Sequence, residues 1–287
     1  MSDGVRTRKL DGRVAVITGA GSGLGRRSAL LFAQEGARLV LADINPGRVQ
    51  RVAEEITAAG GSAIPVSCDI SVEDQVRGLV ERAVSSYGTL DVMFNNAGIS
   101  VLGPFDEGTA EQWQRLLEVN VLGTFFGCKH AIPVMKAKRS GVILNTSSGA
   151  ALAAIPGNAA YAATKGAINV ITRDLAVELG PYNIRVNALC SMGGMSANMA
   201  LPPDAPLVDE DAQDATWDPA QTLYVLATPR PPKLIDHANV ALFLASDDAA
   251  WCSGVCMPVD GATTGKAAID ISRKLASYAA SAKPAEA

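Results

Sequence analysis

Val14-Ala-Val-Ile-Thr-Gly-Ala-Gly-Ser-Gly-Leu-Gly25 is a short apolar run that breaks into a loop of alternating glycines. A glycine-bounded run rich in β-branched residues is typical of a buried parallel strand. Helical periodicity follows from Arg26 to Glu35 and stops at Gly36, a residue type that suits a helix C-cap. The stretch therefore predicts a strand, a tight turn and a helix in direct succession.

The alternation of strand and helix continues along the chain. Short apolar runs predict further strands at Ala37–Ala42, Ala63–Cys68, Leu90–Asn95, Gly141–Thr146, Ile184–Leu189 and Val255–Val259. Helical periodicity predicts further helices at Gly47–Ala59, Val72–Tyr87, Ala110–Lys136, Tyr161–Leu179 and Asp236–Leu244. Such alternation forms a parallel sheet with helices on both faces. We predict an α/β doubly wound parallel sheet (Rossmann fold) in a single domain, 1–287, with its core at 10–265.

Composition narrows the class of protein. The 287 residues are 48% hydrophobic, 19% charged and 5% aromatic, and the formal net charge is −4. Negative charge and few aromatic residues argue against nucleic-acid binding. The N-terminus lacks the apolar stretch of a signal peptide, and no segment approaches the roughly 20 apolar residues of a membrane span. We expect a soluble, cytoplasmic protein with no nucleic-acid or membrane partner.

The cysteines and histidines form no recognisable metal or disulfide pattern. The five cysteines are an odd number without a CxxC pair, and His130 and His237 have no partner at ligand spacing. Cys252 and Cys256 are the one close pair. We expect no metal site, and small buried cysteines in a reducing compartment.

One long segment interrupts the alternation. Seven of the fifteen prolines lie between Pro202 and Pro232, in a window that is also rich in aspartate. Prolines at this density exclude a core helix or a central strand. Long insertions in compact domains are commonly functional lids or poorly ordered segments. We predict an irregular substrate lid at 195–232 and a C-terminal tail, frayed at its end, at 266–287.

The glycine loop and one acidic residue predict a dinucleotide site. Gly19, Gly23 and Gly25 lie between strand and helix, where missing side chains let backbone N–H groups approach a pyrophosphate. Asp43 ends the second strand, 18 residues beyond Gly25. A carboxylate there accepts hydrogen bonds from the adenosine ribose and repels a 2′-phosphate. The alternative for Asp43 is an ordinary surface residue in a turn.

Two arginines, Arg26 and Arg27, follow the loop directly. They could bind the 2′-phosphate of NADP, but positions on a helix surface explain them equally well. Because Asp43 disfavours that phosphate, we predict NAD as the cofactor.

Several segments resemble the short-chain dehydrogenase/reductase (SDR) family, and the resemblance covers most of the chain. Thr18–Gly25 is similar to the family's TGxxxGxG loop, and Asn95-Asn-Ala-Gly98 resembles its NNAG motif. Tyr161-Ala-Ala-Thr-Lys165 resembles its YxxxK motif. Cys68-Asp69-Ile70 is similar to its adenine-contacting acidic turn, and Met257-Pro-Val-Asp-Gly261 to its final strand.

The resemblance implies a catalytic tetrad of Asn120, Ser148, Tyr161 and Lys165. Ser148 stands 13 residues before Tyr161, as the family requires, and Asn120 lies in Val-Asn-Val-Leu-Gly. By resemblance, Lys165 also binds the nicotinamide ribose, and Asn120 holds a water in a proton relay. The cofactor-binding residues implied are Gly19, Ser22, Gly23, Leu24, Gly25, Asp43, Asp69, Ile70, Asn96, Ala97, Gly98, Tyr161, Lys165 and Ser196.

Elementary chemistry supports the pairing of Tyr161 with Lys165. A free tyrosine has a pKa of about 10 and is a poor base near neutral pH. Lys165 lies one helical turn beyond Tyr161, so its cation can favour the phenolate. Tyr161 can then accept an alcohol proton or donate one to a carbonyl oxygen. Ser148, at the carboxyl end of a strand, can hydrogen-bond the reacting oxygen.

Three positions have competing interpretations. Ser147 competes with Ser148 as the substrate-side hydroxyl, and the spacing to the tyrosine selects Ser148. Asp69 could instead cap the helix that begins near Val72. Ser191-Met192 stands where the family usually has Pro-Gly, which changes backbone stiffness beside the nicotinamide and leaves the role of Ser196 in doubt.

The expected activity follows from the site and the lid. Methionines and aromatic residues in the lid suit an adaptable apolar pocket, or pack on the body when the lid closes. Its acidic run disfavours an anionic carrier. We therefore expect an NAD-dependent oxidoreductase (EC 1.1.1.-) that acts on a neutral, hydrophobic secondary alcohol or ketone, whether alicyclic, aromatic or steroid-like. The alternatives are a 3-oxoacyl thioester reductase and a non-catalytic NAD-binding regulator.

The resemblance also implies an assembly. The helices predicted at 110–136 and 161–179 would pair across a two-fold axis in a homodimer or a homotetramer. The apolar stretch Val121–Phe126 fits such burial, although an ordinary core helix would look the same.

Overall fold

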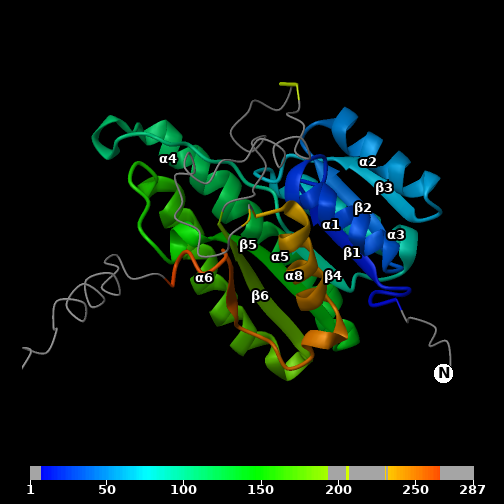
Figure 1. Cartoon of the computed structure of the whole chain (residues 1–287). Helices are drawn as coiled ribbons and strands as arrows, with labels where there is room; N and C mark the ends of the chain where they lie inside the picture. The colour runs from blue at the N-terminus through cyan, green and yellow to red at the C-terminus, as the bar shows by residue number, and fades with distance from the viewer. Residues whose placement is uncertain (1–7, 193–204, 207–229, 231, 266–287) are drawn as a thin grey trace, which may run out of the picture.

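The computed structural model describes residues 8–192, 205–206, 230 and 232–265. Its centre is a seven-stranded sheet in the order β3-β2-β1-β4-β5-β6-β7, in which every neighbouring pair is parallel (Figure 1). The strands are β1 (Val14–Thr18), β2 (Arg38–Asp43), β3 (Ser62–Ser67), β4 (Val92–Asn95), β5 (Gly141–Ser148), β6 (Ile184–Ser191) and β7 (Cys256–Val259). The predicted doubly wound parallel sheet is confirmed.

Helices cover both faces of the sheet, because its strands are apolar on both sides. In β1, Ala15 and Ile17 pack in one core, while Val14 and Val16 pack in the other. The first core is covered by α1 (Gly23–Gln34), α2 (Pro46–Ala58) and α8 (Leu234–Ala245). The second is covered by α3 (Glu73–Tyr87), α5 (Gly123–Lys138) and α6 (Ala159–Leu179).

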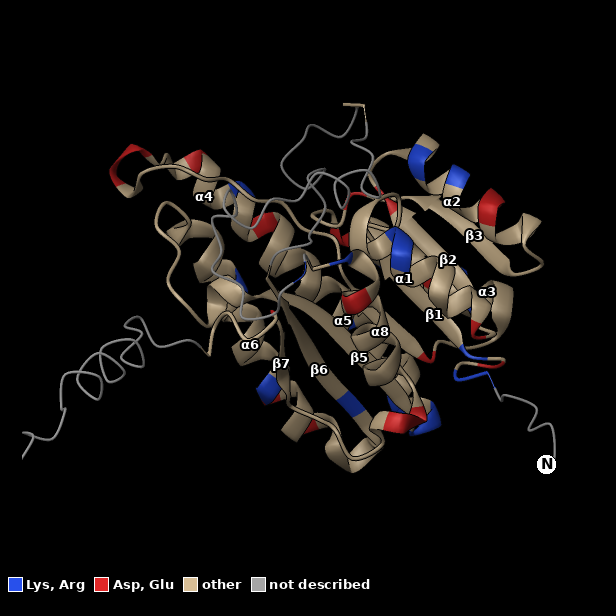
Figure 2. Ribbon diagram, in the orientation of Figure 1, with Lys and Arg blue, Asp and Glu red and all other residues tan. Residues whose placement is uncertain are grey.

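Charged residues stay outside these two cores. Figure 2 shows that Lys, Arg, Asp and Glu lie mainly on the helices and loops, whereas the strands at the centre of the sheet carry few of them. Within the described residues, no helix is long and apolar enough to cross a membrane.

The strand order reverses at β1, which positions the functional site. β1 pairs with β2 on one side and with β4 on the other, so the loops that leave β1 and β4 diverge to opposite faces. In open α/β sheets, ligands bind in the crevice that such a reversal creates at the carboxyl ends of the strands. The glycine loop follows β1 and the Asn96–Gly98 segment follows β4, so both border this crevice.

The predicted long helix at 110–136 is wrong as one regular element. It consists of α4 (Ala110–Leu116), a π-helical segment η2 (Leu117–Leu122) and α5. Asn120 lies in the π segment, and its amide binds the backbone of Ile99. Hydrophobic periodicity could not reveal the π segment, because one wider turn shifts the apolar positions of the helix only slightly. Such π segments are frequent at functional sites.

Short 3-10 turns complete the described elements: η1 (Phe105–Glu107), η3 (Gly149–Ala151), η4 (Gly180–Tyr182) and η7 (Asp247–Ala249). The predicted tail at 266–287 lies outside the described residues, as does nearly all of the predicted lid at 195–232, including Ser196.

Candidate active site

The glycine loop is closed to any added side chain. A Cβ at Gly25 would lie 2.1 Å from the carbonyl oxygen of Gly19, and a Cβ at Gly19 would lie 2.9 Å from Cα of Ala97. Gly19 and Gly23 also have positive φ angles of 65° and 55°. Ser22 is the N-cap of α1, and the side chain of Leu24 is buried. The loop therefore exposes backbone without side chains directly before the N-terminus of α1, an arrangement that fits the pyrophosphate of a dinucleotide.

The loop after β4 is bonded to β1. The hydroxyl of Thr18 accepts the N–H groups of Asn96 at 3.0 Å and Ala97 at 3.1 Å. The amide of Asn96 donates in return to the carbonyl oxygen of Thr18 at 2.9 Å. These bonds hold Asn96 and Ala97 against the glycine loop, as expected for residues that share one cofactor.

Asp43 ends β2 beside the same loop. One of its carboxylate oxygens accepts the N–H of Gly21 at 2.9 Å, and the other accepts the N–H of Asn45 at 2.9 Å. A Cβ at Gly21 would lie 2.8 Å from the first oxygen. The carboxylate is thus held by backbone donors, and each oxygen retains acceptor capacity for a ribose hydroxyl.

Within the described residues, the arginines near Asp43 do not form a salt bridge with it. Arg26 forms a salt bridge with Glu55 of α2 at 2.7 Å. Arg27 lines a separate pocket between α1 and α2, together with Arg38. Arg48, which is buried beside Gly21, donates to the carbonyl oxygen of Ala205.

Asp69 and Ile70 lie in the turn after β3. The carboxylate of Asp69 accepts the N–H and hydroxyl of Ser71 at 2.9 and 2.7 Å, and Arg115 lies 3.5 Å away. Partial burial opposes its ionisation, but these hydrogen bonds and the Arg115 charge outweigh burial and hold the pKa of Asp69 below its usual value. Asp69 does not cap α3, whose N-cap is Val72. Ile70 packs on Gly123.

Lys165 is the buried cation of the site. Its ammonium donates to the carbonyl oxygen of Thr146 at 2.8 Å and lies 5.4 Å from the ring centroid of Tyr161. Lys165 is 2% exposed, and this burial lowers the pKa of its ammonium group to about 8. Gly98 lies beside this ammonium, since a Cβ there would be 3.4 Å from it. The structure thus brings Gly98, Tyr161 and Lys165 together.

The two adjacent serines at the end of β5 have different partners. The hydroxyl of Ser148 accepts the N–H of Ala150 at 3.1 Å and donates to the carbonyl oxygen of Ser191 at 3.5 Å. The fully buried hydroxyl of Ser147 donates to the carbonyl oxygen of Lys165 at 3.0 Å. Ser147 therefore links β5 to α6, and Ser148 lies at the carboxyl edge of the sheet.

Asn120 connects the π segment to the neighbouring loop and to α6. Its side-chain oxygen accepts the N–H of Ile99 at 2.9 Å, and its nitrogen donates to the hydroxyl of Thr164 at 3.1 Å. Thr164 donates in turn to the carbonyl oxygen of Tyr161 at 2.7 Å. A Cβ at Gly98 would lie 3.1 Å from the side-chain oxygen of Asn120, so this residue borders the same space as Lys165.

Sequence reasoning missed three threonines that hold this site. Thr18 binds the two loops together, Thr146 supplies the carbonyl acceptor for Lys165, and Thr164 joins Asn120 to α6. Two of them had a usable signal: Thr18 is the first residue of the TGxxxGxG-like loop, and Thr164 lies three residues after Tyr161, on the same helix face, where a buried polar residue needs a partner.

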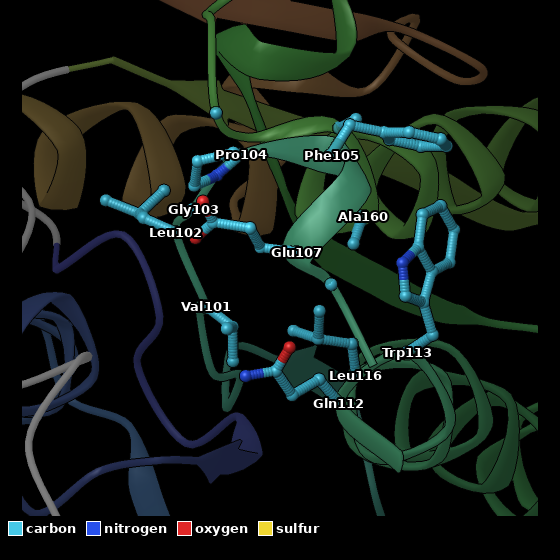
Figure 3. Close-up of a pocket in the computed structure, with 13 residues that line it drawn as sticks. Val101, Leu102, Gly103, Pro104, Phe105, Glu107, Gln112, Trp113, Leu116 and Ala160 are labelled. Atoms are coloured by element: carbon cyan, nitrogen blue, oxygen red, sulfur yellow. The ribbon is translucent and has the colours of Figure 1, made fainter. Parts of the chain in front are cut away.

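A pocket lined mostly by apolar residues, together with Glu107 and Gln112, lies beside the first turn of α6. The segment after β4 and α4 form its walls, and its lining includes Leu102, Phe105 and Trp113 (Figure 3). The rings of Phe105 and Trp113 meet edge to face, with centroids 6.1 Å apart. Ala160, the residue before Tyr161, also lines the pocket. It can receive an apolar group next to the tyrosine-bearing turn.

Metal ligands do not gather in the described part of the chain. No group of three or more His, Cys, Asp or Glu residues there is placed to hold an ion. The five cysteines are free thiols, and Cys68, Cys128 and Cys190 are buried.

The combination of glycine loop, NNAG turn and Tyr–Lys helix has a counterpart in known proteins. A family model described as short chain dehydrogenase matches residues 13–203, which include all of these parts. The chain is a short-chain dehydrogenase. Members of this oxidoreductase family use a nicotinamide cofactor, and the bare glycine cradle with Asp43 beside it fits one.

Relatives cover most of this short-chain dehydrogenase. Tropinone reductase-like 1 of Erythroxylum coca is 40% identical over 264 residues, covering 88% of this chain and 91% of the relative. A 2,5-dichloro-2,5-cyclohexadiene-1,4-diol dehydrogenase of Sphingobium indicum is 37% identical over 255 residues, covering 88% and 96%. A solved 7α-hydroxysteroid dehydrogenase, complexed with NADH and 7-oxo glycochenodeoxycholic acid, is 34% identical with a TM-score of 0.78, covering 90% and 96%.

Proposed function

We propose that this short-chain dehydrogenase transfers a hydride between NAD and a neutral, hydrophobic secondary alcohol or ketone, with Tyr161 as the general acid and base. The observation that carries the proposal is the buried Lys165 ammonium, 5.4 Å from the ring of Tyr161. A cation in a buried site favours a phenolate more strongly than it would in water.

Each catalytic residue has one task. Tyr161 takes the proton of the alcohol during oxidation and returns it to the carbonyl oxygen during reduction. Lys165 stabilises the phenolate, and its lowered pKa of about 8 keeps its own proton exchangeable near neutral pH. NAD, when bound, supplies the hydride acceptor or donor.

Ser148 and Asn120 support the proton transfer. Ser148 donates its hydroxyl hydrogen to the reacting oxygen, which requires that it leave its long 3.5 Å contact with Ser191. The side chain of Asn120 is committed to Ile99 and Thr164. We therefore assign Asn120 to holding the π segment in place, so that its backbone can bind the relay water.

NAD is favoured over NADP by the charges beside the loop. Asp43 places a carboxylate where the 2′-phosphate of NADP would have to lie. The nearby cations are engaged elsewhere, Arg26 with Glu55 and Arg48 with Ala205. A 2′-phosphate would thus meet the repulsion of Asp43, and the charge of Arg26 is already paired with Glu55.

The substrate class rests on the apolar pocket and on the relatives. Among the described residues, the pocket beside α6 is lined mainly by apolar side chains, and Glu107 is the one charged residue that they contribute. An acidic group there suits a neutral substrate better than an anionic thioester carrier. The named relatives act on tropinone-like, cyclohexadiene-diol and steroid substrates, all of which are cyclic alcohols or ketones. We infer an alicyclic, aromatic or steroid-like substrate.

Assembly as a homodimer or homotetramer and location in the cytoplasm complete the proposal. Apolar side chains are exposed on α5 and α6, at Phe125 and Val177 for example, and pairing of these helices between two copies would bury them. Buried free thiols such as those of Cys128 and Cys190 suit a reducing compartment.

The test is NADH formation from a panel of neutral secondary alcohols, with 3-oxoacyl thioesters run in the reductive direction. We expect turnover of alicyclic alcohols with NAD and a loss of at least about 10³-fold in kcat for Tyr161→Phe. The affinity for NAD, measured by calorimetry, should fall far less than kcat in this variant. Faster turnover of thioesters would overturn the substrate class, and NAD binding without any turnover would favour the non-catalytic regulator.

A further inference from the structure

Met192 occupies a position next to the catalytic edge that the activity described above does not use. β5 and β6 end side by side, with Ser148 opposite Ser191 in the register. The next residues are Gly149 and Met192. Where the family usually has Pro-Gly, this chain has Ser191-Met192, so a long side chain stands next to Ser148 in place of a glycine.

The side chain of Met192 lies directly across Gly149. A Cβ at Gly149 would be 2.4 Å from Cε, 2.8 Å from Cβ and 3.3 Å from Cγ of Met192. Met192 is 5% exposed, and its N–H donates to the carbonyl oxygen of Val259 in β7 at 3.2 Å. Its backbone is therefore held by the neighbouring strand while its side chain covers a bare Cα.

Gly149 begins the turn that holds the catalytic hydroxyl. The 3-10 turn Gly149–Ala151 starts directly after Ser148, and the N–H of Ala150 donates to the Ser148 hydroxyl at 3.1 Å. The other contact of that hydroxyl, at 3.5 Å, is the carbonyl oxygen of Ser191, the residue before Met192. Both groups that orient Ser148 are thus adjacent in sequence to the Gly149–Met192 contact.

We propose that Met192 is a positioning residue: its side chain packs on Gly149 and holds the 3-10 turn against β6, so that the Ser148 hydroxyl points at the reacting oxygen. A thioether side chain suits this task because it is apolar, unbranched and able to follow a bare backbone surface. The proposal rests on the proposed function, in which Ser148 binds the substrate oxygen.

The test is a double-mutant cycle on this contact. We expect Met192→Ala to lower kcat about tenfold, since small displacements of a catalytic group cost one to two orders of magnitude. Met192→Leu, which fills similar space, should stay within about threefold of the wild type. Gly149→Ala should lower kcat by clashing with Met192, and Gly149→Ala combined with Met192→Gly, which also removes the Met192 Cβ that would lie 2.8 Å away, should recover part of that loss. NAD affinity should be unchanged throughout.

A matched control exists at the other end of β5. Met135 covers Gly141 in the same way, with a Cβ at Gly141 only 2.5 Å from Cγ and Sδ of Met135. Met135→Ala removes a similarly buried methionine far from Ser148. It should lower the unfolding temperature while kcat stays within about twofold, as expected for a packing defect outside the site.

Three results would overturn the proposal. Met192→Ala could behave like Met135→Ala, with reduced stability and normal kcat. The losses of Gly149→Ala and Met192→Gly could simply add. NAD affinity could fall in parallel with kcat, which would place the effect in cofactor binding. A wild-type chain that oxidises no alcohol would contradict the proposed function itself, before any variant is compared.

Discussion

At the β1–β4 side of the crevice, glycines bring backbone directly against backbone, and Thr18 and Asn96 add side-chain hydrogen bonds. At the β5–β6 side, by contrast, buried side chains donate to backbone carbonyl groups, and no such close backbone packing is needed. On the first side, Gly25 meets the carbonyl of Gly19, and Gly19 meets Cα of Ala97. On the second side, Lys165 donates to Thr146, and Ser147 donates to the carbonyl of Lys165.

The two sides should therefore respond differently to substitution. The backbone-packed side has no space for an added atom, and any side chain there changes the shape of the loop. On the β5–β6 side, an isosteric substitution should leave the shape of the site unchanged and remove only the functional group. We therefore propose that shape controls cofactor binding on one side and that functional groups control proton transfer on the other.

Gly25→Ala should have the largest effect, because its Cβ would overlap the carbonyl oxygen of Gly19 at 2.1 Å. We expect a loss of at least about 100-fold in NAD affinity and of about 3 kcal/mol in the free energy of unfolding, as for severe overpacking. Calorimetric titration with NAD and urea unfolding measure the two quantities.

Gly78→Ala is the control for this experiment. Gly78 lies in α3, and a Cβ there would meet no atom within 4 Å. Its replacement should raise stability by about 0.5–1 kcal/mol and leave NAD affinity unchanged. If Gly25→Ala were as harmless as Gly78→Ala, the backbone-packed side would be more adaptable than the comparison states.

Asp43→Asn sharpens the comparison on the cofactor side, where one side chain does contribute chemistry. The amide can still accept the N–H of Gly21 or Asn45, but the negative charge is lost. We expect the preference for NAD over NADP, as a ratio of kcat/KM, to fall about thirtyfold, since a charged hydrogen-bond partner contributes about 2 kcal/mol. Steady-state kinetics with both cofactors measure the ratio.

Arg27→Ala is the matched charge change at a position that lines a different pocket. It should leave the ratio within about twofold, because a partly exposed charge that lines a different pocket is largely screened by solvent and salt. An unchanged ratio in Asp43→Asn would refute the assignment of cofactor preference to Asp43.

The smallest expected effect tests the buried cation on the catalytic side. Burial lowers the pKa of Lys165 from its ordinary value of 10.5 to about 8. The unfolded chain therefore holds this proton more firmly, and stability should rise with pH between about 8 and about 10.5. Relative to Lys165→Met, the wild type should gain about 1–2 kcal/mol in the free energy of unfolding from pH ~7.5 to ~9.5.

Urea unfolding of both proteins without cofactor measures this difference at the two pH values. An identical pH dependence for wild type and Lys165→Met would mean that the ammonium is solvated. The electrostatic effect of Lys165 on Tyr161 would then be weaker than expected for a buried cation.

Local pattern was sufficient for much of the fold. Apolar runs bounded by glycine marked the strands, and the order of elements followed from their alternation. The helical stretch predicted at 110–136 is present, but a π segment breaks its regularity at Leu117–Leu122, where Asn120 binds the backbone of Ile99 in the loop after β4. This hydrogen bond joins residues that are distant in sequence, so the hydrophobic period of the helix itself could not predict the π segment.

Some contacts of the candidate site were likewise predictable from local spacing, and others were not. Tyr161 and Lys165 lie one helical turn apart on the same helix, so their spacing alone placed them together. The contacts of Asn120 with Thr164 and of Met192 with Gly149 join distant parts of the chain. They exist only because β5, β6 and α6 lie against one another.

The amino-acid sequence by itself determined the parallel α/β architecture and the glycine loop, since both depend on periodicity and on missing side chains over short stretches. Only the tertiary structure decided that Ser147 faces α6 while Ser148 lies at the edge, and that Met192 covers Gly149. The physical reason is that a buried polar group takes whichever partner the packing of strands and helices brings within hydrogen-bonding distance.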